Sequence, residues 1–325
     1  MNLRRLRRTE GIRDLVGETH LLVEDLILPL FVKEGEDIKE AIPSMPGVRR
    51  LSLDNLIRVV EEAYTCGLKG VLLFGVIDKR GLREEVDPRA WDEEGIVQKA
   101  IREIKKKIPQ VVVITDVCVC GYTIHGHCGV VREGEVDNRA TLDILGKISL
   151  SHARAGADFV APSAMMDGEV LYIREILDRE GYDRVGIISY SVKYASSLYY
   201  PFREAVDSSP RFGNRKGYQM DYRNWREAIR EAERDIQEGA DMIMVKPALP
   251  YLDVVSRLRE RFSVPLVVYQ VSGEYNMLRN YVREFFPGDK SKEREVFREA
   301  LTSMKRAGAD LIITYYALEM AKELR

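Results

Sequence analysis

Three cysteines of this 325-residue chain have a spacing that could hold a metal ion. Cys118, Cys120 and Cys128 form the pattern C-x-C-x7-C within the stretch DVCVCGYTIHGHCG. Thiolates are soft ligands that suit zinc, and three protein ligands leave the fourth tetrahedral position open for water or substrate. The alternative is a closed structural site in which His125 or His127 supplies the fourth ligand. The spacing predicts a metal site and leaves its catalytic or structural character open.

Two lysines follow apolar runs and could act as nucleophiles. Lys246 ends the run in DMIMVKPAL and is followed at once by Pro247, so water cannot easily solvate its amine. Burial disfavours the ammonium and leaves a neutral amine that can form a Schiff base with a carbonyl carbon. Lys193, in IISYSVKYASS, has a similar setting, and two facing lysines lower the pKa of at least one. The alternative is a lysine that extends to the surface or pairs with a buried carboxylate.

Eight short apolar runs must position these side chains. Each is rich in β-branched residues, as in a strand buried on both faces, and helical patterns separate the runs. They lie at residues 26–32, 70–76, 111–119, 158–164, 185–191, 241–247, 265–273 and 310–317. Eight βα units predict a (β/α)8 TIM barrel, which gathers its chemistry at the carboxyl ends of the strands. A doubly wound sheet is the alternative, but no G-x-G-x-x-G turn follows the first run.

The joints between helices and strands carry a repeated signature. The tripeptide Gly-Ala-Asp occurs at 156–158, 239–241 and 308–310, each time between a helical pattern and an apolar run. A glycine that ends a helix and leads into a strand explains the repeat.

A barrel would bring the unusual residues to one mouth. Cys118 and Cys120 end the third run, Lys193 follows the fifth by two residues, Lys246 ends the sixth, Ser272 the seventh and Tyr315 the eighth. Residues 199–222, YYPFREAVDSSPRFGNRKGYQMDY, have no clean helix or strand pattern and are typical of a lid. Within them Arg203 and Arg215 could clamp a carboxylate, or make surface salt bridges.

Composition limits the partners. The chain has 50 basic and 52 acidic residues, so no net field attracts a polyanion or an anionic membrane, and we expect a small-molecule partner. No apolar run reaches the roughly 18 residues of a membrane span, and MNLRRLRRTEGIR lacks the apolar core of a signal peptide. We therefore expect a cytoplasmic protein with reduced thiols. No C-x-x-C redox pair is present, and Cys66 is expected to be an inert buried thiol.

The domain organisation follows from the same patterns. Residues 1–20 are polar and rich in arginine, and we expect an arm outside the barrel that lies on another subunit. A free basic tail is the alternative. Residues 21–325 are expected to form a single catalytic barrel domain.

Together these motifs resemble the porphobilinogen synthase family, also called 5-aminolevulinate dehydratase. They are DVCVCGYTIHGHCG, APSAMMDG, SYSVKYASSLYYPFREA, GADMIMVKPALPYLD, YQVSGEY and RAGADLIITYYA, in order along the chain. The resemblance implies a hydro-lyase that condenses two 5-aminolevulinate molecules to porphobilinogen with loss of two waters, an early step of tetrapyrrole and haem synthesis. It also implies the zinc-dependent branch of the family and a homo-oligomer, commonly an octamer.

The family's pattern implies a role for each matching residue. Lys246 and Lys193 each form a Schiff base with one substrate, Asp116 is an active-site acid, and the three cysteines hold zinc. The implied substrate-binding residues are Arg203, Arg215, Ser272, Tyr315, Tyr199 and Ser163. Glu231 matches a ligand of an allosteric magnesium ion, and an exposed helical glutamate is the alternative. Ala164, Tyr200 and Arg139 depart from the family's pattern and leave details of the lid open.

Two other functions are alternatives to the dehydratase. A class I Schiff-base aldolase explains a strand-end lysine but not a second lysine beside three thiols. A non-catalytic zinc-binding barrel explains the cysteines and the arm but leaves both lysines unused. Fold alone decides neither case, and the dehydratase accounts for all of these residues.

Overall fold

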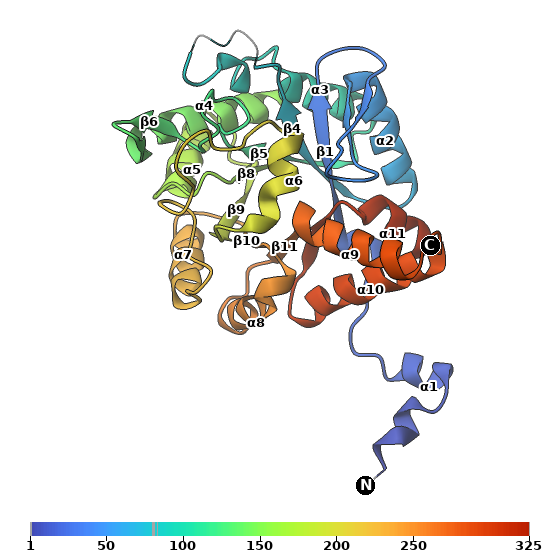
Figure 1. Cartoon of the computed structure of the whole chain (residues 1–325). Coiled ribbons are helices and arrows are strands. Elements are labelled where there is room, and N and C mark those ends of the chain that lie inside the picture. Colours follow the sequence, from blue (N-terminus) through green and yellow to red (C-terminus); the bar gives the residue numbers. More distant parts are fainter. Residues whose placement is uncertain (1, 80–81, 83, 325) are drawn as a thin grey trace.

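The computed structural model describes residues 2–79, 82 and 84–324, and its centre is a closed parallel barrel (Figure 1). The barrel strands are β1 (Leu26–Lys33), β4 (Gly70–Val76), β5 (Val112–Val117), β8 (Phe159–Pro162), β9 (Gly186–Lys193), β10 (Met242–Lys246), β11 (Leu266–Gln270) and β12 (Leu311–Thr314). Each coincides with one of the eight predicted runs. Neighbours pair in chain order, and β12 pairs with β1, so the sheet closes on itself. The predicted (β/α)8 barrel is confirmed, and the open doubly wound sheet is excluded.

Helices surround the barrel, as Figure 1 shows. They are α2 (Leu53–Thr65), α3 (Ile96–Lys107), α4 (Asn138–Ala155), α5 (Glu169–Arg179), α6 (Tyr200–Ala205), α7 (Arg226–Gln237), α8 (Leu252–Arg261), α9 (Ser272–Phe285), α10 (Lys290–Arg306) and α11 (Ala317–Leu324). Short strands β2 (Lys39–Ala41) and β3 (Arg49–Leu51) extend the sheet beside β1, while β6 (Val130–Arg132) and β7 (Glu135–Asp137) form a separate hairpin. In the described part of the chain, no helix is both long enough and apolar enough to cross a bilayer.

Each of the three Gly-Ala-Asp repeats hydrogen-bonds the start of one barrel strand (β8, β10 or β12) to the preceding strand of the barrel. Their glycines follow α4, α7 and α10 with φ of 104°, 105° and 116°, the left-handed region that ends a helix without steric cost for glycine. The aspartates Asp158, Asp241 and Asp310 each accept a 2.7 Å hydrogen bond from the backbone N–H of Val113, Ile187 and Leu266, respectively. Each aspartate N–H also donates to the carbonyl of that same residue. The repeat is therefore a joint that sets strand register.

Aromatic rings fill the barrel beneath its mouth. Tyr269 packs against Tyr190 and Tyr315, with ring centroids 6.4 and 6.1 Å apart, and Tyr315 stacks on Phe31 at 6.1 Å. All four rings are buried. These rings form an apolar layer of low dielectric constant beneath the polar groups of the barrel mouth.

The N-terminal arm projects away from the barrel (Figure 1). It contains the 3-10 turn η1 (Leu3–Arg7) and α1 (Glu10–Leu15), neither of which has a buried residue. Leu3, Leu6 and Leu15 are 61%, 56% and 86% exposed. The contact of this arm with another subunit stays a prediction.

Candidate active site

The three cysteines of the predicted metal site come together at the barrel mouth. Cys118 directly follows β5, and the Sγ atoms of Cys118, Cys120 and Cys128 all lie within 4.8 Å of one another. All three side chains are buried. Hydrogen bonds from its two neighbours hold the pKa of the Cys120 thiol well below its usual range. Three converging thiols with one favoured thiolate suit a soft cation such as zinc. Cys66 is also buried but lies outside this group, as expected.

Neither nearby histidine offers a free ring nitrogen to a metal. His127 pairs through Nδ1 with the Tyr218 hydroxyl at 3.1 Å and through Nε2 with the Phe212 carbonyl at 3.0 Å. His125 accepts the His127 backbone N–H at its Nδ1, 3.0 Å away, and its Nε2 lies 3.3 Å from Glu85. The sequence does not decide between a closed Cys3His site and a three-cysteine site. Because the ring nitrogens of both histidines already have partners, these contacts favour three protein ligands and an unfilled fourth position.

The two lysines stand side by side. Lys193 is the last residue of β9, which runs two residues further than predicted, and its Cα is the register partner of the Lys246 Cα on β10. Lys193 and Lys246 are only 5% and 4% exposed. The Lys246 amine lies 4.3 Å from the ring centroid of Tyr269 and 4.9 Å from that of Tyr190. Burial and the charge of Lys193 lower the pKa of Lys246 to about 7.

Asp116, on β5, interacts electrostatically with Cys120 and with both lysines. Burial and the neighbouring Cys120 raise its pKa to about 6, and the charges of Lys193 and Lys246 act in the opposite direction. Ser163 follows β8, and its carbonyl accepts a hydrogen bond from the Lys193 amine. The structure thus brings the predicted lysines, acid and cysteines into one electrostatic group.

The lid begins with a short helix that the sequence pattern did not predict. Residues 199–222 were expected to lack a helix, but α6 covers residues 200–205, with Pro201 in its first turn, where the missing N–H costs nothing. The centroid of the Phe202 ring lies 5.0 Å from that of Phe74 and 5.8 Å from that of Phe31. The Lys246 amine lies 5.1 Å from the same Phe202 centroid. Contacts from distant strands stabilise this turn, so local patterning could not reveal it.

Two predicted substrate-binding hydroxyls are tied to the lid and to Lys246. The Ser272 hydroxyl accepts the Phe202 backbone N–H at 3.0 Å. Tyr199 donates to the backbone carbonyl of Lys246 at 3.0 Å. On the opposite side the Tyr315 hydroxyl lies 2.9 Å from that of Tyr269. Tyr199 thus contacts Lys246 directly, whereas Ser272 and Tyr315 contact Phe202 and Tyr269, whose rings lie near the Lys246 amine.

Both lid arginines have hydrogen-bonding capacity to spare. Arg215 is 5% exposed and donates from Nη2 to the carbonyls of Gly126 and Ser208, at 2.7 and 2.6 Å. Within the described chain, the buried Nε atoms of Arg203 and Arg215 have no hydrogen-bond partner. A buried donor without an acceptor is unfavourable, so this pair suits an anionic ligand.

The positions that depart from the family's pattern do not disturb this arrangement. The Tyr200 side chain is 66% exposed, and Arg139 is exposed near the start of α4. Ala164 is buried after β8. No ion pair or hydrogen bond of the lid depends on the two exposed side chains within the described residues.

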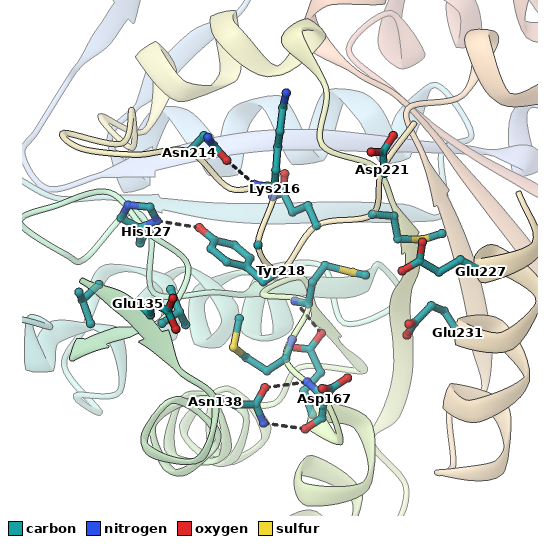
Figure 2. A pocket seen from close by; sticks show the side chains of 18 of the residues that line it. His127, Glu135, Asn138, Asp167, Asn214, Lys216, Tyr218, Asp221, Glu227 and Glu231 are labelled. Carbon is teal, nitrogen blue, oxygen red and sulfur yellow. Dashed lines mark hydrogen bonds between the residues drawn. The ribbon is translucent and has the colours of Figure 1, made fainter. Parts of the chain in front are cut away.

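Glu231 lies in a separate polar pocket beside the lid (Figure 2). The cavity has a volume of about 640 Å³ and is also lined by Asp167, Glu227 and Asp235. Burial and the charges of Asp235 and Asp167 raise the pKa of Glu231 to about 7. Glu231 is half-buried among other acids, and its role as a magnesium ligand stays a prediction. Tyr218, on the rim, also reaches the cysteine loop.

A buried carboxylate that no sequence pattern indicates holds the turn after Lys246. Glu274 is 0% exposed and accepts backbone N–H groups from Val271 at 2.6 Å, from Ala248 at 3.3 Å and from Leu249. It thereby joins the turn that follows β10 to the turn that follows β11. The motif YQVSGEY contains it, but nothing local distinguishes it from an ordinary N-terminal helix glutamate.

The fold and this constellation of groups define the chain as a (β/α)8-barrel enzyme. Two buried lysines, a half-buried acid and three thiols meet at the carboxyl ends of the barrel strands, where enzymes of this fold carry their chemistry.

The comparisons with known proteins are specific. Residues 1–323 match the family model described as delta-aminolevulinic acid dehydratase. The chain is 52% identical over 322 residues to the delta-aminolevulinic acid dehydratase of Methanothermus sociabilis, covering 99% of this chain and 98% of the relative. It is 49% identical over 325 residues to that of Archaeoglobus fulgidus, covering 100% and 98%. The chain belongs to the delta-aminolevulinic acid dehydratase family.

A solved structure agrees with this assignment. The crystal structure of delta-aminolevulinic acid dehydratase (porphobilinogen synthase) from Toxoplasma gondii, in complex with the reaction product porphobilinogen, matches with a TM-score of 0.95. The two chains are 45% identical, and the match covers 99% of this chain and 91% of the other.

Proposed function

We propose that the chain is a porphobilinogen synthase, which condenses two molecules of 5-aminolevulinate to porphobilinogen and releases two waters. The observation that carries this proposal is the pairing of Lys193 with Lys246 beside three buried thiols. Membership of the dehydratase family, and porphobilinogen bound to the Toxoplasma gondii relative, support it.

The lysines account for the carbon chemistry. With a pKa of about 7, Lys246 is neutral in about half of the molecules at neutral pH, so its amine can attack the ketone of one substrate. Loss of water gives an imine that acidifies the neighbouring carbon and prepares it for bond formation. Lys193 is the amine for the second substrate. Asp116, with a pKa of about 6, can accept and return a proton at this pH.

The lid accounts for binding and exclusion of water. The unpaired Nε donors of Arg203 and Arg215 suit the carboxylate of one substrate, and the Ser272 and Tyr315 hydroxyls suit that of the other. Phe202 covers the Lys246 amine and so protects an imine from hydrolysis.

Zinc fits the cysteine cluster on the chemistry of its donors. Cys118, Cys120 and Cys128 would hold it, and when bound it supplies a Lewis acid that polarises a carbonyl or lowers the pKa of a bound water. The occupied ring nitrogens of His125 and His127 support an open coordination position.

The test is covalent trapping. Borohydride added with 5-aminolevulinate should reduce the imine and leave a stable adduct, which peptide mass spectrometry locates on Lys246. A pyruvate- or aldehyde-type substrate trapped in its place would favour an aldolase. Absence of any adduct from either lysine would favour a non-catalytic zinc-binding barrel.

Two further proposals concern regulation and assembly. We propose that Glu231 contributes to an allosteric magnesium site, because a divalent cation would relieve the mutual repulsion of the acids in its pocket. Magnesium should activate the natural protein and not a Glu231→Gln variant. We also propose a cytoplasmic homo-oligomer, commonly an octamer in this family, in which the exposed leucines of the arm contact another subunit. Light scattering before and after removal of residues 2–20 tests the assembly.

A further inference from the structure

Lys79 contacts two segments that the mechanism needs to hold together. It lies three residues beyond the end of β4, and its amine donates to the backbone carbonyls of Cys120 at 3.3 Å, Thr123 at 3.1 Å and Asp207. The first two carbonyls belong to the cysteine loop, residues 118–129, and the third belongs to the lid, residues 199–222. An ammonium has three donors, and these three carbonyls use them all.

The Lys79 amine hydrogen-bonds to these three carbonyls, and the charges of Cys120 and Asp207 also act on it. In the part of the chain that the structure describes, no carboxylate forms an ion pair with Lys79. Hydrogen bonds from a charged donor are stronger than neutral ones, and the partly buried setting of this amine strengthens them further. A lysine solvated at the surface does not need three backbone carbonyls to satisfy its ammonium. The three contacts therefore indicate a specific structural role for Lys79.

The cysteine loop and the lid already lie against each other at their far ends. The Arg211 backbone N–H donates to the His125 carbonyl at 3.0 Å, and the His127 ring contacts the Phe212 carbonyl. At Gly126 the approach is so close that an added Cβ would lie 2.5 Å from the Ser209 carbonyl oxygen. These contacts join two loops to each other. Lys79 joins both of them to a third element, the loop that follows β4.

We propose that Lys79 is a positioning residue that holds the lid closed on the cysteine loop and fixes both to the barrel. It touches neither the reacting lysines nor the thiol sulfurs through its amine, so it acts through the segments that carry them. Its effect on turnover rests on the proposed function. Its effect on lid closure does not, and the two effects can be measured separately.

The first measurement is lid opening, detected by limited trypsin digestion of the full-length protein. Arg211 is an exposed lid residue, and Arg184, in the loop that precedes β9, is an exposed reference site outside both the lid and the arm. In Lys79→Met, cleavage after Arg211 relative to cleavage after Arg184 should rise at least about threefold, because the lid opens more often. Lys106→Met, which removes an exposed lysine from α3, is the matched control and should leave the ratio unchanged.

The second measurement is turnover of 5-aminolevulinate. Lys79→Met should lower kcat/KM at least about tenfold while borohydride still traps substrate on Lys246, since the nucleophilic lysine itself is retained. Lys79→Arg keeps the charge and several donors and should recover part of both effects. If Lys79→Met does not fold, Lys79→Gln, which keeps two donors without the charge, provides the same comparison.

Each outcome decides one part of the proposal. Equal digestion ratios for Lys79→Met and Lys106→Met would overturn the role of Lys79 in lid closure. Faster digestion with unchanged turnover would overturn its role in positioning. If the natural protein does not condense 5-aminolevulinate at all, the proposed function fails, and the digestion result still decides whether Lys79 closes the lid.

Discussion

Lys193 and Lys246 are register partners at the carboxyl ends of two adjacent parallel strands, β9 and β10. Strand pairing thus places two amines side by side in a buried space lined with aromatic rings. Both burial and the neighbouring charge disfavour protonation of Lys246. Burial is the main cause of the lowered pKa of Lys246, and the strand register adds to it by placing the charge of Lys193 alongside.

Trapping of substrate on Lys246 should depend on pH with a midpoint near 7. The pKa of this base is lowered to about 7, so the amine is mostly protonated below that pH and mostly neutral above it. The initial trapping rate should rise roughly tenfold between about pH 6 and about pH 8. Lys193→Met removes a repelling charge and should move the midpoint to higher pH. A midpoint near the ordinary lysine value in the natural protein would contradict this account.

Replacing Lys246 should make the folded protein more stable while abolishing trapping. Because the folded-state pKa lies below the unfolded value, the unfolded chain binds the proton more tightly and stability is lost as pH falls from about 10 toward 7. Lys246→Met should raise the free energy of unfolding at pH 7 by on the order of 2 kcal/mol. Chemical denaturation at two pH values measures this. A gain that is equal at pH 7 and pH 10 would argue against the electrostatic cause.

Each of the three clustered cysteines should be required for zinc. Alanine at Cys118, Cys120 or Cys128 removes one of only three soft donors, so bound zinc should fall below one equivalent and turnover by about 100-fold or more. Cys66→Ala removes an equally buried thiol that lies elsewhere and should change neither. Metal content by mass spectrometry, with chelation and zinc restoration, provides the comparison. Full zinc occupancy in Cys128→Ala would rule out the three-thiol site.

Gly126 should be intolerant of any side chain because the lid backbone packs against it. Its φ is 73°, and a Cβ would meet the Ser209 carbonyl at 2.5 Å. Gly126→Ala should cost about 1–3 kcal/mol of stability and raise KM as the lid is pushed outward. Gly134 has a φ of 85° with nothing within 4 Å of an added Cβ, so Gly134→Ala isolates the backbone strain from the steric clash. Equal KM values for the two variants would contradict a lid contact at Gly126.

Glu274 should matter for the rate more than for substrate affinity. Its carboxylate accepts three backbone N–H groups, two of them in the turn that follows Lys246. Glu274→Gln keeps only one oxygen that can accept a hydrogen bond and points its NH2 group at a backbone N–H. The substitution should therefore lower the free energy of unfolding by about 1–3 kcal/mol and lower kcat. Glu284→Gln, at an exposed site of the same helix, is the control. A variant with unchanged kcat would reduce Glu274 to an ordinary helix cap.

Much of the fold was readable from local patterns. Parallel strands covered by helices are buried on both faces, so their β-branched runs stand out, and all eight were found. Glycine is needed where a helix ends in the left-handed region, so the Gly-Ala-Asp joints were also recognisable. Because strand ends converge in a barrel, the same patterns predicted that Lys246 and Cys118 would share one mouth.

Other features depend on contacts between distant residues. The sequence placed Lys193 two residues beyond its strand, because it cannot show that pairing with β10 extends β9 to that lysine. The helix α6 in the lid exists through packing of Phe202 on Phe31 and Phe74, more than 120 residues away in the chain. Lys79 gave no signal at all, since its partners are backbone carbonyls.

The sequence by itself determined the barrel, the residue types at its mouth and the family, because strand patterns and strand-end chemistry are local properties of the chain. Only the tertiary structure decided how those groups are partnered. His127 is engaged by Tyr218 and by the Phe212 carbonyl, which are 91 and 85 residues away, so both of its ring nitrogens already have hydrogen-bond partners. Burial, which moves the pKa of Lys246 to about 7, likewise arises only when distant strands and the lid close around it.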